Sequence, residues 1–210
     1  MLDIYKNKTY EFFKWRYECR FVYKLALAFC FAMLTGLLAQ VKIYLPFTPV
    51  PITAQTFGVL LSGVMLGARY GAASQGIYAS LGIIGVPWFA GWRGGISILT
   101  SATAGYIAGF IFAAGLIGWF IDRYVKARGF AAMFIIMLIG TSIIYIPGAI
   151  YLALLLHLNL EQALVLGVLP FIPGDIFKAL IAANIASALT PKKAYNGEVD
   201  PSYKPKNWFY

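Results

Sequence analysis

The stretch Phe130–Leu156, FAAMFIIMLIGTSIIYIPGAIYLALLL, contains no charged residue. Because about 20 apolar residues in a helix span the roughly 30 Å hydrocarbon core of a bilayer, a run of this length predicts a transmembrane helix. The whole chain shares this character, since 60% of its 210 residues are hydrophobic and only 12% are charged. A mean hydropathy of +0.74 is too high for a soluble domain of this size. We therefore expect an all-α integral protein that crosses the cell membrane several times.

Other apolar segments on both sides of this stretch predict further spans, so residues 24–190 form a membrane domain of six transmembrane helices. Residues 1–23 are rich in charged and aromatic side chains, which predicts an amphipathic cytoplasmic segment on the membrane surface. Residues 191–210 are polar and predict a loosely ordered cytoplasmic tail. The expected spans are about Lys24–Lys42, Thr53–Leu66, Gly71–Gly85, Ser97–Ile121, Phe130–Leu156 and a broken sixth, Gln162–Thr190.

Two irregular sequences flank the short second and third spans: PFTPVP at 46–51 and GVPWFAGWRGG at 85–95. Irregular backbone at membrane depth survives only where it lines a cavity or is buried in protein. The basic residues give the orientation. Of 17 lysines and arginines, 14 fall on the side of the N-terminus, Lys42 and Arg93 fall on the opposite side, and Lys178 lies within the sixth span. The positive-inside rule then places both termini in the cytoplasm and the two irregular loops outside.

The segment PFIPGDIFKALIAANIASAL, residues 170–189, places two charges inside a predicted span. Pro173 fits the first turn of a helix, so Asp175 follows where the helix dipole favours a carboxylate. Lys178 comes three residues later and faces the same side. A charge at the centre of a membrane helix costs about 2.5 to 3.5 kcal/mol on insertion scales. The two residues therefore either neutralise each other or contact a polar ligand.

Other candidates have two interpretations each. Arg93, between aromatic residues and two glycines, suits bidentate capture of a carboxylate or acts as an interfacial anchor. Gln75 and Tyr78 share one helix side and can hydrogen-bond a ligand or a neighbouring helix. Nearby aromatic residues fit ligand stacking or an ordinary membrane belt: Trp88, Phe89 and Trp92. Small residues at packing spacing serve helix contacts or, on the first span, a partner: Ala28 and Ala32, Gly63 and Gly67, Gly105 and Gly109.

The sequence contains none of the common motifs for nucleotide binding, metal-dependent hydrolysis or serine hydrolases. It contains no phosphate-binding G-x-x-x-x-G-K-[ST] loop, no H-E-x-x-H and no G-x-S-x-G, and the lone His157 forms no histidine metal cluster. The net charge of +9 comes from basic residues that lie mostly on the predicted cytoplasmic side. The positive-inside rule explains this distribution, so the charge does not indicate nucleic-acid binding. These observations favour transport or binding over an enzyme, with no metal.

Three blocks of sequence resemble the BioY family, the biotin-specific substrate-capture (S) components of energy-coupling factor (ECF) vitamin transporters. V-P-I-T-x-Q-T and P-F-I-P-G-D-x-x-K are its specific parts, and the resemblance runs from the first predicted span to the sixth. The blocks are LPFTPVPITAQTFGVLLSGVMLGARYGA (Leu45–Ala72), YASLGIIGVPWFAGWRGGISILTSATAGYIAGF (Tyr78–Phe110) and GVLPFIPGDIFKALIA (Gly167–Ala182).

The resemblance implies a six-helix protein that binds biotin in an outward cavity, without a cofactor, and works with a transmembrane coupling protein and two ATPases. It implies ligand contacts at Asp175, Lys178 and Arg93. The family's A-x-x-x-A docking pattern falls on Ala28 and Ala32, which would face the coupling protein.

The chain departs from the family in one segment. It reads LTSATAGY (Leu99–Tyr106) where the family usually reads L-T-G-P-T-G-G-Y. We therefore expect a more regularly helical entry into the fourth span.

The leading hypothesis is a biotin-capturing S component. The alternative is a stand-alone secondary transporter of a small anionic metabolite, with Asp175 as a proton relay. An intramembrane enzyme would need a nucleophile and base that the sequence does not reveal.

Overall fold

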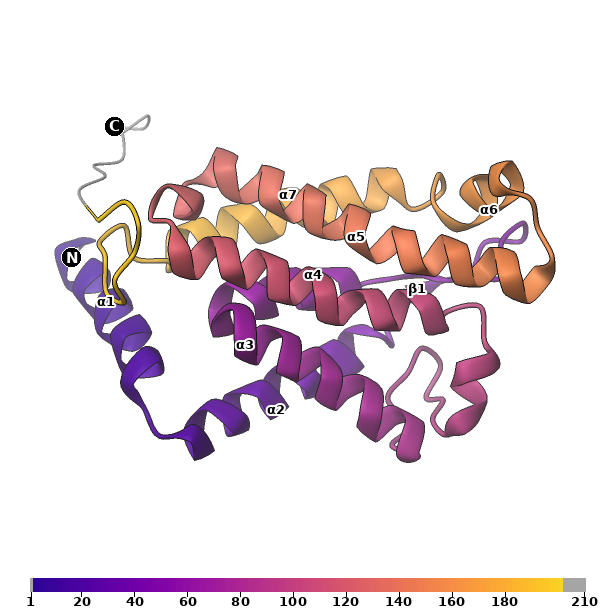
Figure 1. The fold of residues 1–210 in the computed structure, drawn as a ribbon, viewed down its shortest axis with the longest axis horizontal. Coiled ribbons are helices and arrows are strands. Elements are labelled where there is room, and N and C mark those ends of the chain that lie inside the picture. Colours follow the sequence, from indigo (N-terminus) through magenta and orange to yellow (C-terminus); the bar gives the residue numbers. More distant parts are fainter. Residues whose placement is uncertain (1, 202–210) are drawn as a thin grey trace.

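The computed structural model of the protein describes residues 2–201, with side chains from residue 7 onward. The fold is mostly helical, as expected, with two short paired strands and irregular loops between the helices (Figure 1). Residues 202–210 of the predicted tail lie outside the described range. The elements are α1 (Leu2–Glu18), α2 (Phe21–Leu38), β1 (Lys42–Ile43), β2 (Ile52–Thr53), α3 (Gln55–Ile84), η1 (Ile96–Thr100), α4 (Ala104–Arg123), η2 (Lys126–Arg128), α5 (Phe130–Leu156), α6 (Leu160–Gly167) and α7 (Ile172–Leu189).

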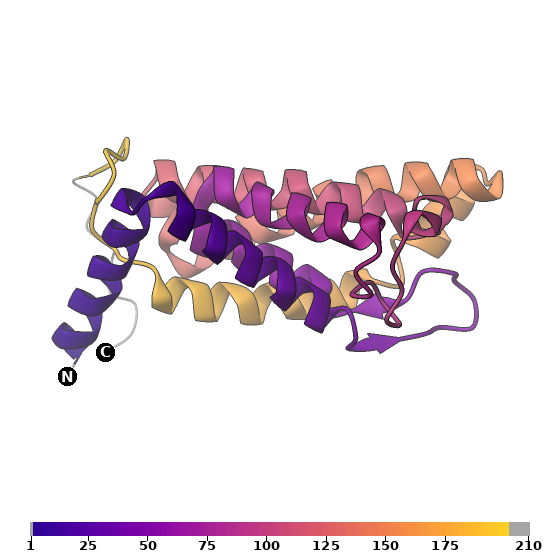
Figure 2. The ribbon, with the colours of Figure 1, turned by 90° about the horizontal axis from the view of Figure 1, so that it is seen from below.

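The long helices lie beside one another in an elongated bundle (Figures 1 and 2). One end carries α1 and residues 190–201, and we call it the terminal end. The opposite end carries the β1–β2 hairpin, η1 and α6, and we call it the loop end. Among the residues described, four helices are long and apolar enough to cross a membrane: α2, α4, α5 and α7. The count of six spans stays a prediction.

Helix α3 is broken at Gly67, whose φ of 77° and ψ of −177° are not helical. The two parts of α3 fold back on each other. Gln75 Nε2 donates to Ser62 Oγ at 3.0 Å, and Gln55 Nε2 donates to the Tyr78 hydroxyl at 2.6 Å. These pairs are spaced almost symmetrically about Gly67, so the segments predicted as the second and third spans form an antiparallel helical hairpin.

The predicted break in the last segment is confirmed. Helix α6 ends at Gly167, and α7 begins at Ile172 with Pro173 in its first turn. The expectation of a regular helical entry into the fourth segment is wrong. Residues 101–103 form a turn between η1 and α4, in which Ser101 Oγ donates to Ile98 O at 2.7 Å. The side-chain hydroxyl thus satisfies a carbonyl that a continued helix would have used.

Glycines let the central helices approach closely, as their spacing predicted. A Cβ on Gly63 would come within 2.7 Å of Ala114 O, and one on Gly105 within 2.3 Å of Pro147 O. Such distances leave no room for any side chain. These glycines therefore serve contacts of α4 with α3 and α5 inside the bundle.

At the terminal end, residues 191–201 pack against the bundle, so the loose order expected of the tail does not hold there. Arg128 is completely buried, and its Nη2 lies 2.5 Å from Glu198 Oε1. The Tyr195 ring lies between two guanidinium groups, 4.4 Å from Arg128 and 5.9 Å from Arg16. Burial alone would raise the pKa of Glu198, but hydrogen bonds from backbone N–H groups and from Arg128 outweigh it and hold that pKa below its ordinary value.

Asp122, near the end of α4, joins three parts of the terminal end. Its Oδ2 accepts from the Ala68 N–H at 2.9 Å, directly after the break in α3. Its Oδ1 lies 2.9 Å from Nη2 of Arg16, which ties α1 to the same point. Asp122 therefore holds both the α3 turn and α1 on the bundle.

The contact between Gly67 and Asp122 predicts a specific loss of stability. In Gly67→Ala, the new Cβ would lie 2.2 Å from Asp122 Oδ2, and the residue would keep a positive φ. We expect the free energy of unfolding to fall by about 1 to 3 kcal/mol from backbone strain alone, and further from the clash. Gly76→Ala is the matched control, because a Cβ there meets nothing within 4 Å and alanine favours a helix interior by about 0.5 to 1 kcal/mol. Thermal unfolding in detergent measures both, and equal melting temperatures would contradict the role of Gly67.

Candidate ligand-binding site

A narrow cavity lies between the start of α3 and the helices α4, α5 and α7. Its wall combines apolar side chains with a few converging polar groups, which is the usual composition of a small-molecule site. The lining residues are Val50, Pro51, Thr53, Gln55, Thr56, Thr103, Tyr106, Ile107, Phe110, Ile144, Tyr145, Phe171, Asp175 and Lys178. Two of the predicted site residues, Asp175 and Lys178, are therefore brought together in one cavity.

Asp175 is 4% exposed, and both of its carboxylate oxygens are bonded to other helices. Thr56 Oγ1 of α3 donates to Oδ1 at 2.8 Å, and the Tyr145 hydroxyl of α5 donates to Oδ2 at 2.5 Å. The carboxylate also lies in the first turn of α7, where the helix dipole stabilises negative charge. The structure thus compensates a buried charge that would otherwise be expensive.

Lys178 forms the counter-charge. Its Nζ lies 2.5 Å from Asp175 Oδ1 and donates to Thr53 O of β2 at 2.7 Å. The pair confirms mutual neutralisation, one of the two sequence interpretations. Both residues also line the cavity, so a pair that neutralises itself can still contact a ligand. Ligand contact by Asp175 and Lys178 stays a prediction. Lys178 also links α7 to the strand that precedes α3.

Gln75 and Tyr78 do not line this cavity, although the sequence made them candidates. Both are fully buried. Gln75 Nε2 donates to Thr35 Oγ1, Ser62 Oγ and Ser74 Oγ inside the α2–α3 contact. The helix-packing interpretation therefore describes Gln75.

Tyr78 acts on the cavity through a neighbour. Its hydroxyl accepts from Nε2 of Gln55, whose Oε1 accepts from Thr53 Oγ1 at 3.0 Å. Both Gln55 and Thr53 line the cavity. Tyr78 thus fixes the orientation of a side chain that can reach a ligand.

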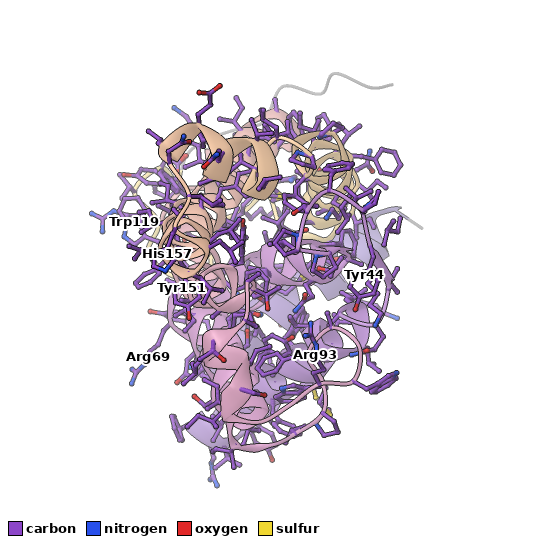
Figure 3. The ribbon with its side chains drawn as sticks, turned by 90° about the vertical axis from the view of Figure 1, so that its right-hand side faces the viewer. Tyr44, Arg69, Arg93, Trp119, Tyr151 and His157 are labelled. Carbon is purple, nitrogen blue, oxygen red and sulfur yellow. The ribbon has the colours of Figure 1, made fainter. Side chains whose placement is uncertain are left out.

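Arg93 lies at the loop end but not in the cavity wall. Its Nε donates to Ala90 O at 3.1 Å, and its side chain is exposed. Figure 3 looks onto the loop end and shows Arg93 on the same side of this face as Tyr44, opposite Tyr151 and His157. Among the described side chains, no ion pair includes Arg93. The guanidinium is therefore available to an anion outside the protein.

The aromatic residues beside Arg93 have different environments. Trp88 and Phe89 belong to the buried core, where Trp88 Nε1 donates to Tyr78 O at 2.9 Å and Phe89 packs edge-on to the Tyr78 ring. Trp92 is 65% exposed. Of the three, only Trp92 has the exposure of a membrane-belt or ligand-facing residue.

Sequence reasoning did not select several residues of the cavity. Thr53, Gln55 and Thr56 all fall in the PITAQT sequence, which carries part of the family resemblance but has no pattern that indicates a site. Tyr145 had no signal of its own, because it lies within a long apolar run. A polar residue inside such a run, facing a buried charge on another helix, can be recognised only after the helices are packed.

Ala28 and Ala32, the predicted docking pair, are both completely buried within the chain. The outward side of α2 instead exposes large apolar side chains: Leu25, Phe29, Met33 and Leu37. In this form of the protein the two alanines are thus not accessible to a partner.

The sequence pattern of the BioY family matches residues 8–194 of the chain. The chain belongs to the BioY family. The resemblance noted in the sequence is thereby confirmed.

Among BioY relatives, a probable biotin transporter of Methanothermobacter thermautotrophicus is 46% identical over 156 residues, which cover 70% of this chain and 98% of the relative. The biotin transporter of Rhizobium etli is 40% identical over 160 residues, covering 73% of this chain and 84% of the relative. These relatives are transport proteins, not enzymes.

One solved structure has the same fold. It is the crystal structure of the S-component for biotin from an ECF-type ABC transporter, with a TM-score of 0.74 and 30% sequence identity. The match covers 80% of this chain and 90% of the other. Together with the apolar helices, the comparisons establish a membrane protein of the transporter class.

The buried ion pair predicts a non-additive effect on stability. In Lys178→Met, the Asp175 carboxylate loses its counter-charge while it stays 4% exposed, so we expect the free energy of unfolding to fall by about 3 kcal/mol. Adding Asp175→Asn removes the uncompensated charge and should restore most of that loss. Denaturation of the two single variants and the double variant in detergent measures the coupling. Additive losses would show that the two charges do not stabilise each other.

Proposed function

We propose that the protein is the biotin-capturing S component of an ECF-type transporter. The observation that carries the proposal is the Asp175–Lys178 pair, placed in a small cavity in a chain whose relatives are biotin transporters. Its role is to bind the vitamin outside the cell, without chemistry of its own. Biotin is then the transported ligand and not a cofactor.

The chemistry of biotin matches the cavity. Its ureido group has two N–H donors and one carbonyl acceptor, and its fused rings are apolar. Asp175 can accept from the N–H groups through its remaining lone pairs, and Lys178 can donate to the carbonyl oxygen. The rings would lie against apolar wall residues such as Ile107, Phe110 and Phe171. Gln55 and Thr56 would supply further hydrogen bonds.

Arg93 would recognise the carboxylate at the end of the biotin tail. Arg93 lies at the loop end and belongs to no ion pair among the described side chains, and guanidinium binds carboxylates bidentately. A ligand whose rings occupy the cavity would extend its tail toward this face.

The hairpin loop between β1 and β2 would cover the bound ligand. Thr48 Oγ1, in this loop, donates to Leu166 O of α6 at 2.7 Å, and Val50 is buried in the core. Lys178 binds the end of the same loop at Thr53 O. Release of these contacts would open the cavity, and their formation would retain the ligand.

The topology belongs to the same proposal. With six membrane segments and both termini in the cytoplasm, the terminal end faces inward and the loop end faces outward. The distribution of lysine and arginine supports this orientation. The cavity then opens to the side from which the vitamin arrives.

As the family resemblance implies, a transmembrane coupling protein and two ATPase subunits would drive transport, and this sequence contains no phosphate-binding loop of its own. Helix α2 would face the coupling protein through its exposed apolar side. Contact through Ala28 and Ala32 would require α2 to move relative to α3, since both alanines are buried in this form.

Biotin binding tests the site. We expect the purified protein to bind one biotin, and Asp175→Asn to weaken binding by about 10- to 100-fold, since a hydrogen bond to a charged group contributes about 1.5 to 3 kcal/mol. Isothermal titration in detergent measures the affinity, and the melting temperature reports whether the variant is folded.

Glu161→Gln is the matched control, because Glu161 is an exposed acidic residue in the first turn of α6 at the same end of the bundle. Its affinity should equal that of the wild type. A folded Asp175→Asn variant with unchanged affinity would remove Asp175 from the site.

The source of energy distinguishes the alternative, a stand-alone secondary transporter of a small anion that uses Asp175 as a proton relay. We expect concentrative biotin uptake into proteoliposomes only when the coupling protein, both ATPases and ATP are present. Uptake by this chain alone that follows the proton gradient and ignores ATP would favour the alternative.

A further inference from the structure

A cluster of basic and aromatic side chains lies at the terminal end, where α1 joins α2 and α3 turns. It contains Tyr17 of α1, Lys24 near the start of α2, and Arg69 and Tyr70 just after Gly67, and we call it the Lys24–Arg69 patch. Lys24 Nζ lies 5.9 Å from the centre of the Tyr17 ring and 5.8 Å from that of Tyr70. Arg69 Cζ lies 5.8 Å from the same Tyr70 ring. Two cations from different helices thus share one aromatic ring.

The positive charge of this patch has no acidic partner among the side chains that the structure describes. The ion pairs among the described side chains are Arg16–Asp122, Arg128–Glu198 and Lys178–Asp175, and none of them includes Lys24 or Arg69. Lys24 Nζ donates to Tyr17 O at 2.7 Å, a neutral acceptor that leaves its charge uncompensated. The exposed Arg20 adds a third cation, one helical turn before Lys24. The exposed Glu18 at the end of α1 is the acidic residue nearest to it in the chain, and α2 has none in its first turn, so positive charge is in excess. Such a concentration of like charge attracts an anion from outside the chain.

Exposed apolar side chains adjoin the patch along α2. Phe21 is 60% exposed, Val22 is 70% exposed and Leu25 is 42% exposed, and α2 has the length and hydropathy of a membrane span. The Phe21 ring also lies 6.5 Å from that of Tyr70. Basic and exposed apolar side chains therefore adjoin at the start of α2, where this predicted span would enter the membrane. This combination suits a ligand with an anionic head and an apolar tail.

We propose that the Lys24–Arg69 patch binds the headgroup of an anionic phospholipid. The phosphate oxygens accept hydrogen bonds from the Lys24 ammonium and the Arg69 guanidinium, while the Tyr70 ring keeps both cations in place. The acyl chains lie against the exposed Phe21 and Val22 at the start of α2. The orientation proposed above places this phospholipid in the inner leaflet, and that assignment rests on the proposed function. The site itself follows from the side chains.

The chain offers a matched control at the same end of the bundle. Arg123, the last residue of α4, lies over the Trp119 ring with its Cζ 5.6 Å from the ring centre. The pairing of a cation with an exposed aromatic residue resembles that in the patch, but it involves no residue of the patch. Arg123→Ala therefore removes an equivalent surface charge without touching the proposed site.

The test is native mass spectrometry of the detergent-solubilised protein, titrated with dioleoyl phosphatidylglycerol or with dioleoyl phosphatidylcholine. We expect the wild type to retain phosphatidylglycerol in preference to phosphatidylcholine. Arg69→Ala should lower the phosphatidylglycerol affinity about fivefold, and Lys24→Ala with Arg69→Ala together about 25-fold, following the usual contribution of each basic residue near an anionic lipid surface. Arg123→Ala should retain the wild-type affinity.

Melting temperatures of the lipid-free variants separate a folding defect from loss of the site. Arg69 is exposed, so the single variant stays informative if removal of Lys24 disturbs the α1–α2 junction. Equal binding of the two lipids, or equal losses in Arg69→Ala and Arg123→Ala, would overturn the proposal. So would displacement of phosphatidylglycerol by millimolar inorganic phosphate, which would show a simple anion site. Because no measurement uses biotin, a failure here is distinct from a failure of the proposed transport function.

Discussion

The loop end of this protein depends on the hydrogen bonds and the ion pair that surround the buried carboxylate of Asp175. A charge in this position is tolerated only when donors surround it. The donors come from three helices, with Thr56 on α3, Tyr145 on α5 and Lys178 on α7 itself. Satisfying one side chain therefore fixes the positions of three helices relative to one another. The cavity exists between them for the same reason.

The pair also connects the site to the surface loops. Lys178 bonds to Thr53 O, so the charge inside the cavity holds the end of the β1–β2 hairpin loop. A second contact, from Thr48 to Leu166 O, holds the middle of that loop against α6. In the proposed function, a ligand that alters the Asp175–Lys178 pair would also alter the hydrogen bond from Lys178 to Thr53 O, and so would affect the loop that covers the ligand. Binding and closure then share one set of hydrogen bonds.

The terminal end is organised by different charges that serve a structural purpose. Asp122 receives the first N–H after the break in α3 and pairs with Arg16 of α1, while Arg128 and Glu198 hold the chain after α7. These groups bring α1, the break in α3, the end of α4, η2 (Lys126–Arg128) and the chain after α7 together at the terminal end. The middle of the bundle, by contrast, is held by apolar packing and close contacts at glycines. The ion pairs thus lie toward the two ends of the bundle, and the buried polar contacts between them, such as those of Gln75, are made by uncharged side chains.

The sequence by itself determined the all-α membrane class, the break before α7, and the identity of the central ion pair. Apolar length, proline positions and a three-residue spacing are local properties that need no tertiary information. It also led to the BioY family through motifs that are contiguous in the chain.

Only the tertiary structure decided which polar residues share the cavity with that pair. Thr56 and Asp175 are 119 residues apart, and Tyr145 and Asp175 are 30 apart, so their contacts depend on how the helices pack. The same applies to Gln75, Ala28 and Ala32, which helical spacing alone could not distinguish between an inward and a partner-facing role. Spacing defines which residues share one side of a helix, but packing decides what that side meets.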